Sequence, residues 1–141
     1  MDINITLIKN SKAHVYVNEY KKLLYIELLD KTYNKEEFFE CLDYIKNFWI
    51  LTSYGDKIYG QVFICYDVDI YPFEFFDLFI KTLKGLEHIF KKNLKASCLI
   101  NQSTAIKVLK PVLNAYQAVR PFKFFEDLEE GITFVNSQII E

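Results

Sequence analysis

No apolar run in this sequence approaches the ~20 residues that a membrane-spanning helix needs. The first residues, MDINITLIKN, lack both the basic region and the apolar stretch of a secretory signal peptide. Basic and acidic residues nearly balance, 17 against 19, so the net charge of −2 gives no general attraction to nucleic acid or to anionic lipid. We therefore expect a soluble, cytoplasmic protein that does not bind nucleic acid.

Glycine and histidine are scarce, and their spacing excludes several kinds of active site. The glycines form neither a GxGxxG pattern nor a P-loop, so no loop that cradles phosphate is predicted. The two histidines, His14 and His88, have no Cys, Asp or Ser partner at a recognisable catalytic spacing. We predict that the protein is not an enzyme and takes no cofactor.

Three cysteines, Cys41, Cys65 and Cys98, form no CxxC pair and leave one unpaired under any pairing. Buried, reduced thiols are the favoured interpretation, in agreement with a cytoplasmic location. Cys65 and Cys98 fall in two apolar stretches that are typical of core strands, where burial raises the thiol pKa and makes the group unreactive.

A length of 141 residues is typical of one domain, and the chain contains no linker rich in Pro, Gly or Ser and no internal repeat. We therefore predict a single domain over residues 1–141. In the first thirty residues, alternating apolar and polar positions predict an N-terminal antiparallel hairpin. The same alternation occurs at Ile3, Ile5 and Leu7, and it is compatible with an extra edge strand.

After the hairpin, helical and strand patterns alternate, which predicts an α/β fold with a mixed, mainly parallel sheet and helices packed against it. Asn34 is a suitable N-cap for the first helix, and Pro111 is expected to kink the third. The predicted elements are a helix over 34–52, a strand over 58–68, a helix of about six turns over 72–93, a strand over 95–101, a helix that starts at Ser103 or Thr104, a strand over 121–125 and a helix over 126–135.

This order of elements resembles the STAS fold of anti-sigma-factor antagonists and the related SpoIIAA-like and CRAL-TRIO group. The most specific stretch is CLINQSTAIKVLKPVLNAYQAVRPFKFFEDLEEGITFV, which is similar to the family pattern of strand, helix, short strand and terminal helix. Gly131 stands where the family commonly has Ala. The resemblance implies a single STAS/SpoIIAA-like domain and a non-enzymatic role in protein interaction or regulation.

One turn departs from the phospho-switch members of that family. They carry a phosphorylated Ser or Thr where the central strand enters the second helix, whereas residues 67–73 of this sequence read DVDIYPF. Asp67 and Asp69 would also oppose an added phosphate. We therefore expect the usual switch to be absent. Ser103 and Thr104, at a predicted helix N-terminus, are the next candidates for phosphorylation, although helix capping explains them equally well.

Asp67 and Asp69 are also the only candidates for a metal site, because carboxylate oxygens at the carboxyl end of a strand suit Mg²⁺. The spacing identifies no further metal ligand. The favoured interpretation is that Asp67 is a solvated loop residue and that Asp69 caps the following helix. The resemblance leaves a second function open, namely a small lipid-binding or membrane-peripheral module of the CRAL-TRIO type. The short chain weighs against it, since that group's lipid pocket needs additional helices.

The apolar residues of the second predicted helix cover a much wider arc than the ~100° stripe that packs on a sheet. Neighbouring helices would cover the excess in an ordinary core. The alternative is a surface for a protein partner or for self-association as a homodimer, to which we assign Tyr71, Phe75, Leu78 and Ile89. Phe76, Leu83 and Phe90 lie nearer the centre of the arc and are predicted to be core.

Overall fold

The computed structural model describes residues 3–66, 73–102, 111 and 116–139, and contains one six-stranded sheet in the order β1-β2-β3-β4-β5-β6. β1, β2 and β3 are antiparallel, whereas β3, β4, β5 and β6 run parallel. The predicted mixed sheet is confirmed, and the extra edge strand is β1. The strands are β1 (Asn4–Lys9), β2 (Ala13–Asn18), β3 (Leu23–Leu28), β4 (Tyr59–Ile64), β5 (Leu94–Ile100) and β6 (Phe122–Phe125).

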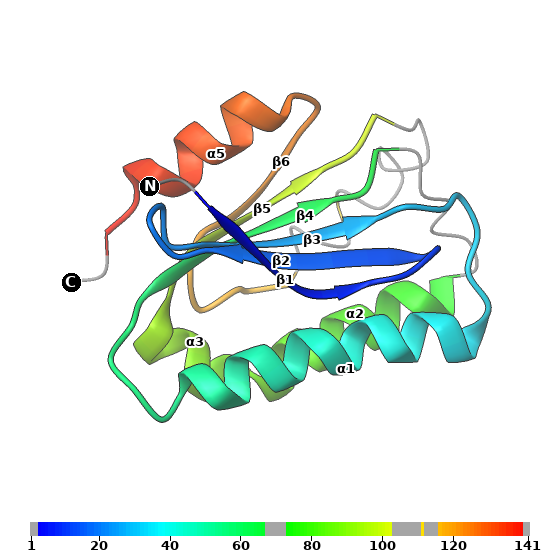
Figure 1. Ribbon diagram of the computed structural model, residues 1–141, viewed down its shortest axis with the longest axis horizontal. Helices are drawn as coiled ribbons and strands as arrows, with labels where there is room; N and C mark the ends of the chain where they lie inside the picture. Colours follow the sequence, from blue (N-terminus) through cyan, green and yellow to red (C-terminus); the bar gives the residue numbers. More distant parts are fainter. Residues whose placement is uncertain (1–2, 67–72, 103–110, 112–115, 140–141) are drawn as a thin grey trace.

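Helices cover both faces of the sheet, which gives three layers (Figure 1). Among the helices that the structure describes, α1, α2 and α3 lie on one face and α5 lies on the other. We call the three helices on one face the helical layer. The helices are α1 (Lys35–Thr52), α2 (Phe73–Gly85), α3 (Glu87–Asn93) and α5 (Leu128–Ser137). None of the described helices is long and apolar enough to cross a membrane.

Helix α1 begins where its sequence predicts. The Asn34 side chain accepts a hydrogen bond from the backbone N–H of Glu37, and the Glu37 carboxylate accepts one from the backbone N–H of Asn34, each at 2.9 Å. This reciprocal cap satisfies two donors that a helix start otherwise leaves free. One stripe of α1 faces the sheet and is buried: Phe38, Cys41, Leu42, Ile45 and Trp49.

The single helix predicted over 72–93 is wrong, because the chain breaks at Leu86 into α2 and α3. Leu86 has φ −102° and ψ 1°, and its backbone N–H reaches Leu83 O at 3.1 Å. Glycine is a weak helix former, so Gly85 is a favourable place for the break. Ile89 lies in α3 after this turn and is buried in the core.

A buried polar chain links α1 to the middle of the sheet. Trp49 Nε1–H donates to Gln61 Oε1 at 2.8 Å, and Gln61 Nε2 donates to Ser97 Oγ at 3.1 Å. The three residues come from α1, β4 and β5, and all are buried. Because buried polar groups without partners are costly, these bonds favour one register between the helix and the two strands.

Helix α5 packs on the other face at close range, and two glycines permit it. A Cβ at Gly60 of β4 would overlap Val135 Cγ1 and lie 2.8 Å from Leu23 Cδ2. A Cβ at Gly131 of α5 would lie 2.6 Å from Ile100 Cδ1. Gly131 therefore leaves room for the side chains of β5.

Candidate functional site: a groove on the helical layer

A surface hollow with a volume of about 450 Å³ lies between α1 and the α2–α3 pair. We call it the α1–α2 groove. It is lined by residues from all three helices of the helical layer: Lys46, Ile50, Leu78, Lys81, Thr82, Gly85, Leu86, His88 and Ile89. Residues far apart in the sequence therefore meet at one surface.

The groove has an apolar floor and a polar rim. Leu86 and Ile89 are buried and form the floor with the partly buried Leu78, while Ile50 of α1 is 43% exposed on one wall. The exposed side chains at the rim are Lys46, Lys81 and His88. An apolar floor with polar edges is typical of a surface that binds another protein segment.

Gly85 lies in the wall of this groove, and a Cβ there would meet no heavy atom within 4 Å. None of the described glycines has a positive φ, so neither the backbone conformation nor the packing requires glycine at this position. The lack of a side chain leaves space in the groove.

The structure separates the four residues assigned to a partner surface. Leu78 and Ile89 both line the groove. Ile89 was expected at an uncovered margin, and this is wrong: it is only 3% exposed and packs in the core cluster of the helical layer. Phe75 lies elsewhere, with its ring stacked on Phe38 at 5.1 Å between centroids. Tyr71 lies outside the described residues, and a binding role for any of the four stays a prediction.

The residues expected at the centre of the arc, Phe76, Leu83 and Phe90, are core, as predicted. The groove residues contributed by α1 could not be found in the same way, because the helical pattern of 72–93 contains no information on which helix packs beside it. One signal was present: Ile50 is apolar but falls outside the buried stripe of α1.

A second hollow lies inside the molecule, between the helical layer and the carboxyl ends of the parallel strands. Its volume is about 60 Å³. Its lining is apolar except for Asn101, whose Nδ2 donates to Cys65 O at 2.6 Å. The lining residues are Ile26, Leu28, Phe38, Cys41, Leu42, Ile45, Phe63, Cys65, Phe75, Phe76, Phe79, Leu99 and Asn101.

The three cysteines are free and buried, as the sequence predicts. Burial raises the pKa of Cys41 to about 11 and the pKa values of Cys65 and Cys98 to about 12. Because the thiolate is the reactive form, these groups are poor nucleophiles at neutral pH.

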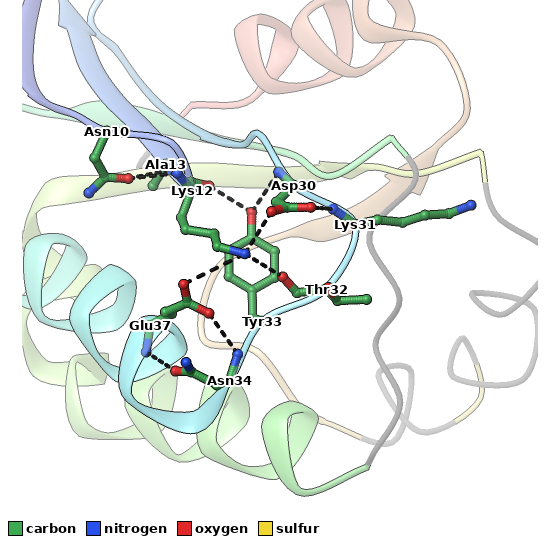
Figure 2. Close-up of polar contacts among 9 residues, drawn as sticks. All are labelled: Asn10, Lys12, Ala13, Asp30, Lys31, Thr32, Tyr33, Asn34 and Glu37. Carbon is green, nitrogen blue, oxygen red and sulfur yellow. Dashed lines mark hydrogen bonds and ion pairs between the residues drawn. The ribbon is translucent and has the colours of Figure 1, made fainter.

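A polar cluster joins the β1–β2 turn to the start of α1 (Figure 2). Lys12 Nζ lies 2.6 Å from Asp30 Oδ2, donates to Thr32 O at 3.0 Å and lies 3.6 Å from Glu37 Oε2. The buried Tyr33 hydroxyl donates to Lys12 O at 2.6 Å. The Lys12 hydrogen bond lowers the pKa of Asp30, and the same bond raises the pKa of Lys12. These contacts hold the turn against the helix start.

Within the part of the chain that the structure describes, no three His, Cys, Asp or Glu side chains gather as a metal site. Asp67 and Asp69 lie outside that part, as do Ser103, Thr104 and most of the helix predicted to follow them. His14 is partly buried and lies 3.1 Å from Thr6 Oγ1, while His88 is exposed in the groove rim.

Neither a protein-family model nor a curated protein matches this sequence. Among solved structures, the chain is similar to an uncharacterized protein of the DUF3478 family from Shewanella loihica PV-4, which has a SpoIIAA-like fold. The two share 15% sequence identity over 94% of this chain and 92% of the other, with a TM-score of 0.53.

The chain has a SpoIIAA-like fold. The resemblance seen in the sequence is confirmed at the level of the fold. A SpoIIAA-like fold by itself leaves function open, because one fold serves many functions, and the functional argument must therefore rest on the site.

Proposed function

We propose that this SpoIIAA-like domain is a non-enzymatic protein-interaction domain with a regulatory role, and that its partner binds in the α1–α2 groove. The observation that carries the proposal is a hollow of about 450 Å³ in which Ile50 and the partly buried Leu78 stay accessible beside the buried Leu86 and Ile89. An apolar segment from another protein would gain free energy by covering Ile50 and Leu78.

The chemistry of the other candidate groups supports a binding role. The cysteine thiols are buried and have raised pKa values, and the Lys12 cluster is used to join two segments of the fold. Residues 67–73 contain no Ser or Thr, so the proposed regulation does not use the family's usual phosphorylation turn. Phosphorylation of Ser103 or Thr104 remains a separate proposal.

Lipid binding is the second candidate function, because the interior cavity has an almost wholly apolar lining. Its volume of about 60 Å³ weighs against it, since this is less than half of the roughly 150 Å³ of a cavity that binds benzene. A lipid chain would require α1 and α2 to move away from the sheet.

The test uses a photoreactive amino acid placed at position 50 or at position 51 in the native host. Ile50 lines the groove, whereas the neighbouring Leu51 is 73% exposed and does not. We expect a crosslink to one defined protein from position 50 and not from position 51. The crosslinked peptide is identified by mass spectrometry, and Gly85→Leu in the same chain should abolish the product.

Crosslinks of equal yield from the two positions would contradict binding in the groove. A crosslink from position 50 to a second copy of this chain would show that the partner is the protein itself. The groove would then be a homodimer interface. Native mass spectrometry of the protein purified from the host tests the lipid function, because a bound lipid that dissociates on unfolding would favour that candidate instead.

A further inference from the structure

We infer that the segment that binds in the α1–α2 groove is an acidic amphipathic helix, and that Gly85 is a specificity-determining residue that admits it. The inference rests on the proposed function and adds the chemistry of the partner. Its three supports are the charge of the rim, the shape of the groove and the open space at Gly85.

The rim carries basic groups and no acidic lining residue. Lys46 lies 3.9 Å from Asp43 on α1, a loose ion pair between exposed side chains. For Lys81 and His88, no described acidic group lies within ion-pair distance. Rim charges select partners of opposite sign and suppress partners of like sign. The available charge therefore favours carboxylates beside the apolar contacts.

The walls of the groove are helices, and α1 and α2 run side by side in the helical layer (Figure 1). A helix that binds between two others places side chains at i, i+4 and i+7 in the furrow and keeps its backbone hydrogen bonds internal. A hollow of about 450 Å³ leaves room for two or three aliphatic side chains.

Gly85 supplies the third support. Glycine weakens a helix relative to alanine, and the fold gives no steric reason for glycine here. A longer side chain at this position would occupy part of the groove, because Gly85 is itself a lining residue. Glycine at this position thus allows the helix to end before Leu86 and also leaves the groove open to an entering side chain.

The test measures the binding of two labelled helical peptides of about four turns by fluorescence anisotropy. Both carry leucine at i, i+4 and i+7, and the flanking positions are glutamate in one peptide and lysine in the other. We expect the glutamate peptide to bind roughly tenfold more tightly, and the difference to shrink as salt is added. Lys81→Glu should weaken the glutamate peptide roughly fivefold and strengthen the lysine peptide.

Two matched variants serve as controls. Lys84→Glu makes the same charge change on an exposed residue of α2 outside the groove, and it should leave the preference between the peptides in place. Gly85→Leu should abolish the binding of both peptides, whereas Lys84→Leu, which places the same side chain one residue earlier, should not. Circular dichroism checks that all four variants remain folded.

Equal binding of the two peptides, blocked by Gly85→Leu, would overturn the acidic partner and leave the proposed function standing. Failure of both peptides, together with a position-50 crosslink to a protein segment that is not an acidic helix, would overturn the inference alone. Binding that Gly85→Leu leaves unchanged would overturn the role of Gly85.

Discussion

Glycine has a different role where α5 packs on the sheet and in the helical layer. At the α5 face, a Cβ at Gly60 would overlap Val135, and a Cβ at Gly131 would displace the end of the Ile100 side chain. In the helical layer, Gly85 faces open space. The α5 face is thus closed by direct contact between helix and sheet, whereas the outer surface of the helical layer keeps a hollow. This difference gives the glycines of the first face a structural role and is consistent with the binding role that we propose for the groove.

Gly60→Ala should have the largest effect on stability. The new methyl group overlaps Val135 and crowds Leu23, so we expect a loss of roughly 1–3 kcal/mol in the free energy of unfolding, measured by urea denaturation. Gly131→Ala should lower stability less, since the atom 2.6 Å from its added Cβ is the end of the Ile100 side chain, which can shift.

A double variant tests the cause. Val135→Ala removes the atom that Gly60→Ala would overlap, so the two changes together should cost less than the sum of the single changes. Gly55→Ala, where the nearest atom is 4.0 Å from the new Cβ, is the matched control and should change stability little. Wild-type stability in Gly60→Ala would show that the α5 face is not closely packed.

Gln61→Met should have an effect of similar or slightly smaller size on the other face. The change keeps the approximate volume but removes the acceptor of Trp49 Nε1–H, and an unpaired buried donor costs roughly 1–3 kcal/mol. The measurement is urea denaturation, with Ser97→Ala as the comparison. A neutral result would mean that the helical layer does not depend on this polar chain.

Gly85→Ala should raise stability by about 0.5–1 kcal/mol, the opposite sign to Gly60→Ala, because alanine is the better helix former and meets no obstacle. Thermal unfolding followed by circular dichroism measures the change. A loss of stability would remove the contrast between the two faces.

Lys12→Met should have the smallest effect, and the effect should depend on pH. The pKa of Asp30 is lowered from 3.8, so its contribution is present above that value and is lost as pH falls through the pKa of the folded state. The pKa of Lys12 is raised from 10.5, so its contribution is lost as pH rises through the pKa of the folded state.

The difference in melting temperature between wild type and Lys12→Met should therefore be largest near neutral pH and shrink below about pH 4 and above about pH 10.5. Lys31→Met is the control, because Lys31 extends away from the cluster (Figure 2). A difference that is constant from pH 3 to pH 8 would contradict the role of the Lys12–Asp30 pair.

The sequence predicted those features that depend on neighbouring residues. The Asn34 cap and the buried stripe of α1 follow from local spacing, and the buried runs of β4 and β5 follow from apolar composition. The break at Leu86 was missed, because the apolar pattern continues through it. The groove was missed in part, since Ile50 and Gly85 meet only after two helices pack together.

The bond from Trp49 to Gln61 also determines how α1 is turned about its own axis. Successive residues of a helix are rotated by about 100°, so anchoring one side chain sets the direction of all the others. Ile50 follows Trp49 directly, and Lys46 lies one turn earlier. An indole that is hydrogen-bonded in the centre of the protein thus aims two side chains at the groove outside. A substitution at Gln61 would then change the affinity of a partner that binds in the groove without contacting Gln61.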